Sequence, residues 1–107
     1  MSLDISLSAM KETCVFEYNI THNLNTMAED AGIYKHLWSP EEIGITHASQ
    51  LIEPLTKGLE LLRSDRERFE KFNPENGWGN YDDLVEFVEN YLIACIKNPD
   101  AKISASR

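Results

Sequence analysis

Residues 80–99 of the chain read NYDDLVEFVENYLIACIKNP, and this stretch decides much of the fold. Its apolar residues recur every three or four positions, which is typical of one face of an amphipathic helix. These residues are Leu84, Phe87, Val88, Tyr91, Leu92, Cys95 and Ile96. Two aspartates fall in the first turn and a lysine in the last, where each charge suits the helix dipole. We therefore predict a long core helix that is capped by Asn80 and ended by Asn98-Pro99.

Both ends of the chain carry the alternating pattern of β-strands. Apolar residues occupy every second position in two early runs, Leu3, Ile5 and Leu7 and then Cys14, Phe16, Tyr18 and Ile20. Because the side chains of a strand alternate between its faces, each run presents one face to a core. The two runs are close enough for a hairpin, and residues 102–106 alternate weakly, as a third strand would. We predict an α+β fold, a single domain over residues 1–107 in which a small antiparallel sheet from the chain ends packs against four to five helices.

Start and stop signals for short helices fill the middle of the chain. Thr26, Ser39 and Ser64 each precede a glutamate by three residues, which indicates a capped helix start, and Thr46 is a further cap. Glycines at 32 and 44 indicate helix ends. In the apolar stripe that follows Thr46, proline at 54 predicts a kink or a break at Glu53. A glycine at 58 in the same stripe predicts close packing.

The composition excludes several classes of protein. The 107 residues include 10 basic and 18 acidic side chains, a formal net charge of −8, and 42% hydrophobic residues. Such a chain is too apolar for intrinsic disorder, and no run approaches the about 20 apolar residues that cross a bilayer. It also lacks the basic surface that non-specific nucleic-acid binding requires. Because the N-terminus has no apolar segment of a secretion signal, we expect an acidic cytoplasmic protein without membrane contact.

The spacing of possible ligand residues does not support metal or thiol chemistry. His22, His36 and His47 fall in three separate elements without a paired spacing, so we predict no metal and no cofactor. Cys95 lies on the apolar face of the last helix, and Cys14 lies inside a strand. A reactive cysteine needs an exposed, electropositive setting, and we expect neither thiol to have one.

Two short, nearly uncharged strings form a candidate binding site. Residues 21–23, THN, fall where the second strand gives way to a helix, and residues 76–81, NGWGNY, precede the last helix. Their ring and amide side chains suit a flat ligand or an extended peptide. We predict a pocket for a small ligand or a partner protein, lined by His22, Asn23, Asn76, Trp78 and Tyr81. The competing interpretation is structural: the histidine satisfies a buried backbone group, the tryptophan fills the core, and asparagines cap helices.

Two further functions are alternatives to a binding module. In the first, His22 is the general acid or base of a small enzyme and is oriented by Asn23 or Asp30. In the second, an acidic face formed by the last helix and residues 60–70 imitates nucleic acid and occupies a basic partner. Basic residues at 63, 66, 68 and 71 interrupt that face, and such charges more often keep a small protein soluble. No phosphate loop, G-x-S-x-G or H-E-x-x-H motif is present, which argues against common kinases and hydrolases.

The two strings also carry a resemblance to a known family. Residues 19–24, NITHNL, and 73–81, NPENGWGNY, are similar to signatures of a family of small uncharacterised proteins from bacteria and tailed phages. Residues 99–101, PDA, resemble the closing stretch of that family, so the likeness covers most of the chain. Because the family has no established activity, the resemblance implies a cytoplasmic, phage-related protein and no catalytic assignment.

Overall fold

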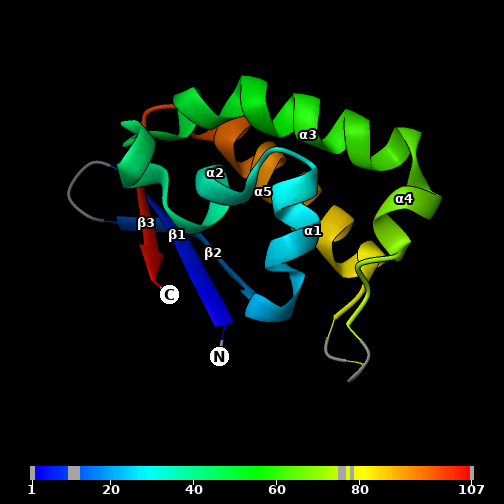
Figure 1. The fold of residues 1–107 in the computed structure, drawn as a ribbon. Helices are drawn as coiled ribbons and strands as arrows, with labels where there is room; N and C mark the ends of the chain where they lie inside the picture. The colour runs from blue at the N-terminus through cyan, green and yellow to red at the C-terminus, as the bar shows by residue number, and fades with distance from the viewer. Residues whose placement is uncertain (1, 10–12, 75–76, 78, 107) are drawn as a thin grey trace.

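The computed structural model describes residues 2–9, 13–74, 77 and 79–106, and Figure 1 shows how the elements are arranged. Its strands are β1 (Ser2–Ala9), β2 (Thr13–Thr21) and β3 (Lys102–Ser106). Its α-helices are α1 (Asn25–Asp30), α2 (Tyr34–Trp38), α3 (Ile52–Ser64), α4 (Arg66–Glu70) and α5 (Tyr81–Lys97). Short 3₁₀ helices are η2 (His22–Leu24), η3 (Pro40–Ile43) and η4 (Ala48–Leu51). The predicted α+β fold is confirmed.

Within the described residues, β1 is the central strand of a three-stranded antiparallel sheet, with β2 on one side and β3 on the other. Ile5 lies opposite Tyr18 of β2 and Ala105 of β3, so the apolar positions of the three strands share one face. The helices pack over this face (Figure 1), while Asp4 on the other face is exposed. The predicted hairpin and the third strand are both confirmed. No helix in the described part of the chain has the length and apolar character needed to cross a membrane.

A β-bulge at Val15 changes which face the start of β2 presents. Leu7 lies opposite Phe16, but the next residue, Ser8, lies opposite Cys14, so Val15 is the extra residue. A one-residue shift in register moves a side chain to the other face of a sheet. Cys14 is therefore exposed beside Ser8 on the solvent face, and the expectation that both thiols are hidden is wrong for this one.

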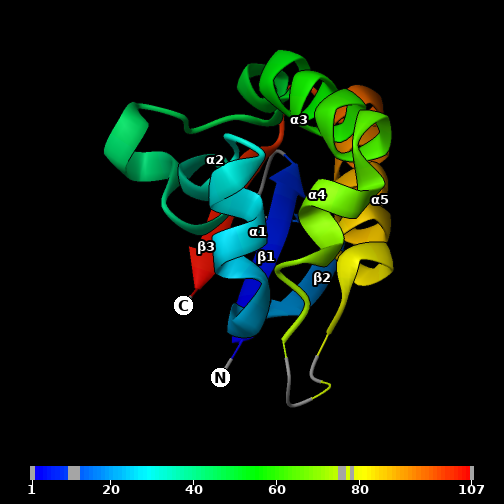
Figure 2. The same cartoon turned by 45° about the vertical axis from the view of Figure 1, so that its right-hand side comes forward.

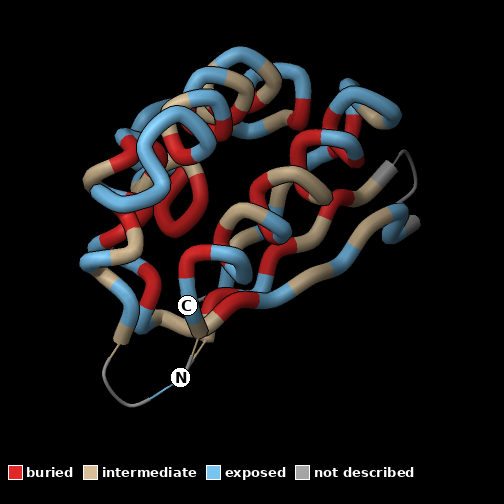
Figure 3. Tube along the Cα trace, turned by 90° about the vertical axis from the view of Figure 1, so that its right-hand side faces the viewer, coloured by how far each residue is buried: buried red, intermediate tan, exposed pale blue. Residues whose placement is uncertain are grey.

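Helix α5 lies along β2 and supplies much of the core, whose buried positions recur along the strands and helices in Figure 3. Phe87 meets the Tyr18 ring edge to face at 5.4 Å, and Tyr91 stacks on Phe16 at 6.0 Å. The predicted cap and end of this helix are confirmed. Ile96 was expected on the apolar face but is 55% exposed. At about 100° per residue it lies half a turn from Phe87, so it falls beyond the edge of the buried stripe.

The short helices between β2 and α3 follow most of the predicted signals. Pro40 is the first residue of η3, and Gly32 and Gly44 end helical turns with φ of 79° and 74°. The start predicted at Thr26 is wrong, because α1 begins one residue earlier. The Thr26 hydroxyl instead donates to the side chain of its neighbour, Asn25, at 3.2 Å.

Helix α3 starts later than predicted, and this later start explains why the helix tolerates Pro54. Thr46 does not cap the helix; η4 follows His47, whose N–H donates to the Gln50 side chain at 3.0 Å. Helix α3 then begins at Ile52, which makes Pro54 its third residue. The first N–H groups of a helix have no helical partner, so a proline there removes no hydrogen bond. The alternative of a break near Glu53 is thus closer to the structure than a kink.

The far part of α3 confirms one prediction and corrects another. Gly58 packs against Ile33, and a Cβ atom added to it would collide with that side chain, so the glycine does permit close packing. Ser64 is not the cap of α4; its hydroxyl donates to the Leu61 carbonyl at 2.8 Å at the end of α3. Asp65 caps α4 by accepting the N–H of Arg68 at 3.4 Å.

Candidate functional site

The two strings singled out in the sequence meet in the structure through Gly79. A Cβ atom on this glycine would lie 2.7 Å from Cγ2 of Thr21 and 3.1 Å from Cδ1 of Leu24, both at the junction after β2. Its φ of 90° is also in the region that side chains other than glycine rarely adopt. A larger residue would be strained here on both grounds, so glycine lets the second string lie against the first.

A cavity of about 240 Å³ lies at this meeting point. The end of β2 forms one wall with Tyr18, Asn19, Ile20 and Thr21. Leu24, Gly79 and the first turns of α5, with Asp83 and Glu86, form the rest. The cavity lies beside the THN junction and the start of α5. Of the five residues expected to form a site, His22, Asn23 and Tyr81 are not among its lining residues, and Asn76 and Trp78 lie outside the described residues.

Two carboxylates give the cavity a negative charge. Asp83 and Glu86 are three residues apart on α5 and so lie on the same side of the helix. Within the described part of the chain Glu86 forms no ion pair, and both side chains are exposed. The exposed Asn19 and the half-buried Tyr18 of β2 also line the cavity. This set of groups is suited to a positively charged ligand atom that can also donate hydrogen bonds.

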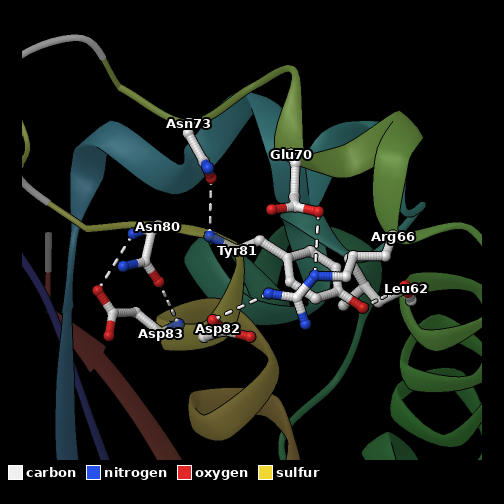
Figure 4. A network of polar contacts seen from close by, with 8 residues as sticks. All are labelled: Leu62, Arg66, Glu70, Asn73, Asn80, Tyr81, Asp82 and Asp83. Carbon is white, nitrogen blue, oxygen red and sulfur yellow. Dashed lines mark hydrogen bonds and ion pairs between the residues drawn. The ribbon is translucent and has the colours of Figure 1, made fainter.

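The end of the loop at α5 is held by a reciprocal pair of hydrogen bonds, shown in Figure 4. The Asp83 N–H donates to Oδ1 of Asn80 at 3.0 Å, and the Asn80 N–H donates to Oδ2 of Asp83 at 3.1 Å. Upstream, Oδ1 of Asn73 accepts the N–H of Tyr81 at 2.8 Å (Figure 4). These contacts satisfy N–H groups at the start of α5 and fix the Asp83 carboxylate beside the cavity.

Tyr81 belongs to the core and does not line the cavity. Its side chain is 5% exposed, and its hydroxyl donates to the Leu62 carbonyl of α3 at 2.6 Å (Figure 4). The Arg66 guanidinium lies 4.8 Å from the centre of its ring. Burial raises the pKa of the phenol above its usual value. The stacking role expected for Tyr81 is corrected accordingly: as the first residue of α5 it is turned towards α3, where it satisfies a carbonyl.

Of the other four predicted residues, two do not line this cavity and two lie outside the described residues. His22 is half-buried against Trp38, with ring centres 6.1 Å apart, and Nε2 is buried without a hydrogen-bond partner among the described residues. Asn23 is exposed, and its N–H donates to the Thr21 hydroxyl at 3.3 Å. Neither residue is among those that line the cavity. Asn76 and Trp78 lie outside the described residues.

The arrangement expected for acid–base catalysis by His22 is not present among the described residues. Asp30, one of its two expected orienting partners, accepts a hydrogen bond from Nε of Arg68 at 2.7 Å. Asn23 makes no side-chain hydrogen bond to the ring in this part of the chain. The described residues therefore contain no second group that orients the His22 ring.

The other groups considered for chemistry are the buried Cys95 thiol and possible metal ligands. Burial raises the pKa of the Cys95 thiol to about 12, which keeps it protonated and unreactive. Over the described ranges, no group of three or more histidine, cysteine or acidic side chains is placed to hold a metal ion. The cavity at Thr21 and Gly79 combines a hollow with two acidic lining residues.

Arginines divide the acidic surface that would be needed to imitate nucleic acid. Arg63 pairs with Glu89 at 2.7 Å, and Arg66 pairs with Glu70 at 3.0 Å and Asp82 at 3.1 Å. The positive charges thus lie among the carboxylates of α4 and α5. A mimic of the phosphate backbone requires a continuous negative face, so this arrangement counts against that function.

Sequence reasoning missed the residues of β2 that line the cavity. Tyr18 was assigned to the core face and Asn19 to the solvent face of β2, and both are among the residues that line the cavity beside Gly79. Asp83 and Glu86 were noted as helix charges and not as ligands. The available signal was their position in the first turns of α5, directly after the glycine that lies against Thr21.

Comparisons of this chain with protein-family models, with curated proteins and with solved structures found no match. The resemblance to the small bacterial and phage proteins stays a prediction, and the cavity itself carries the functional argument.

Proposed function

We propose that the protein is a non-catalytic binding module whose cavity at Thr21 and Gly79 takes a positively charged group. The group is an amine or a guanidinium, carried by a small ligand or by a side chain of a partner protein. We also propose that the protein acts in the cytoplasm, because its N-terminus has no apolar segment of a secretion signal, and that it is related to small phage proteins, because of its two strings. No catalytic step is part of it.

The observation that carries the proposal is the pair of carboxylates beside a cavity of limited size. Asp83 and Glu86 converge on a space of about 240 Å³, below the about 300–1,000 Å³ of typical pockets for drug-sized ligands. Such a space suits a single side chain or a small amine better than a nucleotide. Two unit charges 4 Å apart attract by about 1 kcal/mol in water and by about 4 kcal/mol near a protein surface. The attraction is therefore modest, as expected of a module that recognises one residue of a partner.

The test is a titration of the labelled protein with N-acetylarginine methylamide, followed by nuclear magnetic resonance. We expect amide shifts at Asn19, Thr21, Gly79 and Glu86 and none of comparable size with the neutral citrulline analogue. Glu86→Gln should weaken binding about twofold to fivefold, as loss of one exposed charge pair does. Glu60→Gln on α3 removes the same charge away from the cavity and should leave the affinity unchanged.

Three results would contradict the proposed function. The citrulline analogue would bind as tightly as the arginine compound, the shifts would fall away from the cavity, or Glu60→Gln would weaken binding as much as Glu86→Gln. The last result would show that only the overall negative charge attracts the ligand.

A further inference from the structure

A second and larger cavity, of about 430 Å³, lies beside β3, at the other edge of the sheet from β2. Its apolar walls are Pro40, Ile45, Ile103 and Ala105. Its polar lining is Glu41, Thr46, His47 and Lys102. Figure 2 shows β3 on one side of β1 and β2 on the other, so the two cavities border different strands. The volume lies within the about 300–1,000 Å³ of typical small-molecule sites.

Residues 45–47, which line one side of this cavity, are held in place by Gln50. Its Oε1 atom accepts the N–H of Thr46 at 2.8 Å and the N–H of His47 at 3.0 Å. Its Nε2 atom donates to the Gly44 carbonyl at 3.3 Å. The Ile103 N–H also donates to the Thr46 carbonyl at 2.9 Å, which ties this segment to β3. The lining segment is thus fixed by hydrogen bonds before any ligand arrives, which lowers the entropy cost of binding.

Lys102 is the positive charge of this cavity. Its side chain is exposed and makes no ion pair within the described ranges, although acidic residues outnumber basic ones in the chain by 18 to 10. Lys102 opens β3, and its main chain forms a bridge with His47. The backbone therefore fixes the origin of its side chain next to the histidine. An ammonium group in this place can pair with an anion from outside the protein.

His47 adds a hydrogen-bond donor at the same end of the cavity. Its Nδ1 atom lies 2.7 Å from the Thr46 hydroxyl. When that hydroxyl donates to Nδ1, the neutral ring carries its proton on Nε2. When the ring is charged, Nδ1 donates to the hydroxyl, which can turn to Oε1 of Gln50 at 3.2 Å. In these two arrangements Nε2 bears a proton and can donate to a ligand. When a neutral ring instead carries its proton on Nδ1 and donates to the Thr46 hydroxyl, Nε2 is an acceptor, and a bound carboxylate selects the forms in which Nε2 donates.

The remaining lining side chains limit the ligand to one negative charge with an apolar body. Glu41 is the single acidic residue among the described lining residues, and it is exposed. It and the net charge of −8 oppose a multiply charged anion such as a phosphate. The four apolar walls, in contrast, can cover a hydrocarbon chain or ring. Lys102 pairs with Ser8 while Ile103 pairs with the buried Leu7, so Lys102 lies on the opposite face of β3 from Ile103. A ligand that reaches Lys102 and His47 as well as Ile103 therefore lies across the edge of β3.

We propose that this cavity binds a small monocarboxylate with an apolar chain or ring. The carboxylate accepts hydrogen bonds from Lys102 and His47, and the apolar part lies against Ile45 and Ile103. This site is separate from the one proposed for a cationic group, and either can exist without the other.

Octanoate and octylamine, which share an alkyl chain and differ in charge, test the inference by nuclear magnetic resonance of the labelled full chain. Octanoate should shift the signals of Ile45, His47, Lys102 and Ile103, and octylamine should not. Lys102→Met keeps most of the side chain and should weaken octanoate binding about threefold or more, because it removes the charge that pairs with the carboxylate. Lys71→Met, at the end of α4, removes the same charge elsewhere and should leave the affinity unchanged.

A second variant tests the same charge balance from the opposite side. Glu41→Gln removes the opposing carboxylate and should tighten octanoate binding, in a protein whose melting temperature verifies its fold. The inference is overturned if octylamine binds in this cavity as well as octanoate does, or if octanoate shifts signals elsewhere only. Unchanged affinity in a folded Lys102→Met protein would also overturn it. Octylamine carries the kind of cationic group proposed for the cavity at Gly79, so octylamine shifts at Asn19, Thr21, Gly79 and Glu86 report on that proposal and not on this one. Octanoate shifts beside β3 test this inference alone, so each proposal can fail without the other.

Discussion

The Leu62 carbonyl shows how one tyrosine can be structural inside a string that resembles a binding motif. It lies in the last turn of α3, where carbonyl groups receive no N–H from their own helix. The Tyr81 hydroxyl supplies the missing donor at 2.6 Å from a buried position. Gly79, two residues earlier in the chain, contacts Thr21 instead. Neighbouring residues of one string thus serve the core and the cavity separately.

We expect Tyr81→Phe to destabilise the protein by about 1–2 kcal/mol, because it leaves the buried Leu62 carbonyl without a donor. Tyr34→Phe is the matched control: the Tyr34 hydroxyl makes no hydrogen bond among the described residues, and its change should stay within about 0.5 kcal/mol. Urea unfolding followed by circular dichroism measures both. Equal losses in the two variants would show that the hydroxyl of Tyr81 contributes nothing specific.

At the scale of elements, α5 serves both the core and the candidate site. The face that includes Phe87 and Tyr91 packs on the aromatic residues of β2. Asp83 and Glu86, on its first turns, line the cavity at Gly79. Because the helix is held by its buried face, its acidic groups are carried on a rigid support, which is what a preorganised site requires.

Phe87→Ala should lower the free energy of unfolding by about 3–5 kcal/mol, because the ring is 1% exposed and its removal leaves a cavity in the core. Ile96→Ala, on the same helix, should change stability by no more than about 0.5 kcal/mol, since that side chain is 55% exposed. Chemical unfolding of both variants measures the difference. A large loss for Ile96→Ala would mean that this side chain is covered in solution, for example by a second copy of the chain.

At the scale of the whole molecule, some of the acidic side chains behind the net charge of −8 form ion pairs between distant elements. Arg63 joins α3 to Glu89 of α5, and Arg68 joins α4 to Asp30 at the end of α1. The sequence indicates a solvated acidic surface that keeps the protein soluble. The structure adds that several of these carboxylates also connect helices.

The contact between Asp30 and Arg68 predicts a pH dependence of stability. The hydrogen bond from Arg68 lowers the pKa of Asp30 below its usual 3.8, so the folded state favours the ionised carboxylate. Its stabilising effect is therefore present above pH 3.8 and is lost as the pH falls through the lower folded pKa. Asp30→Asn should reduce the melting temperature at neutral pH and match the wild type in strong acid.

Thermal unfolding over a series of pH values measures this difference. Glu67→Gln on α4 is the control, because it removes a carboxylate near Arg68 that forms no ion pair in the described part of the chain. It should show no comparable loss at neutral pH. A deficit in Asp30→Asn that persists in strong acid would show that the side chain acts through packing.

The sequence predictions succeeded where a feature depends on neighbouring residues, and they failed where it depends on residues far apart in the chain. Asn80 was identified as a cap because capping involves residues only three positions apart. Cys14 was misplaced because its face depends on a bulge in the pairing of two strands. The sequence singled out the two strings that meet at Gly79, but it did not identify the residues of β2 and α5 that line the cavity there. They belong to elements more than 60 positions apart in the chain.

The sequence by itself determined the α+β class, the hairpin, the third strand and the long core helix. These follow from periods of two and 3.6 residues and from caps, which are properties of neighbouring residues. Only the tertiary structure decided that Tyr81 faces α3, that Gly79 touches Thr21, and that Lys102 and His47 share a cavity. The physical reason is that a cavity depends on which distant surfaces pack together, and no local period in the sequence encodes that choice.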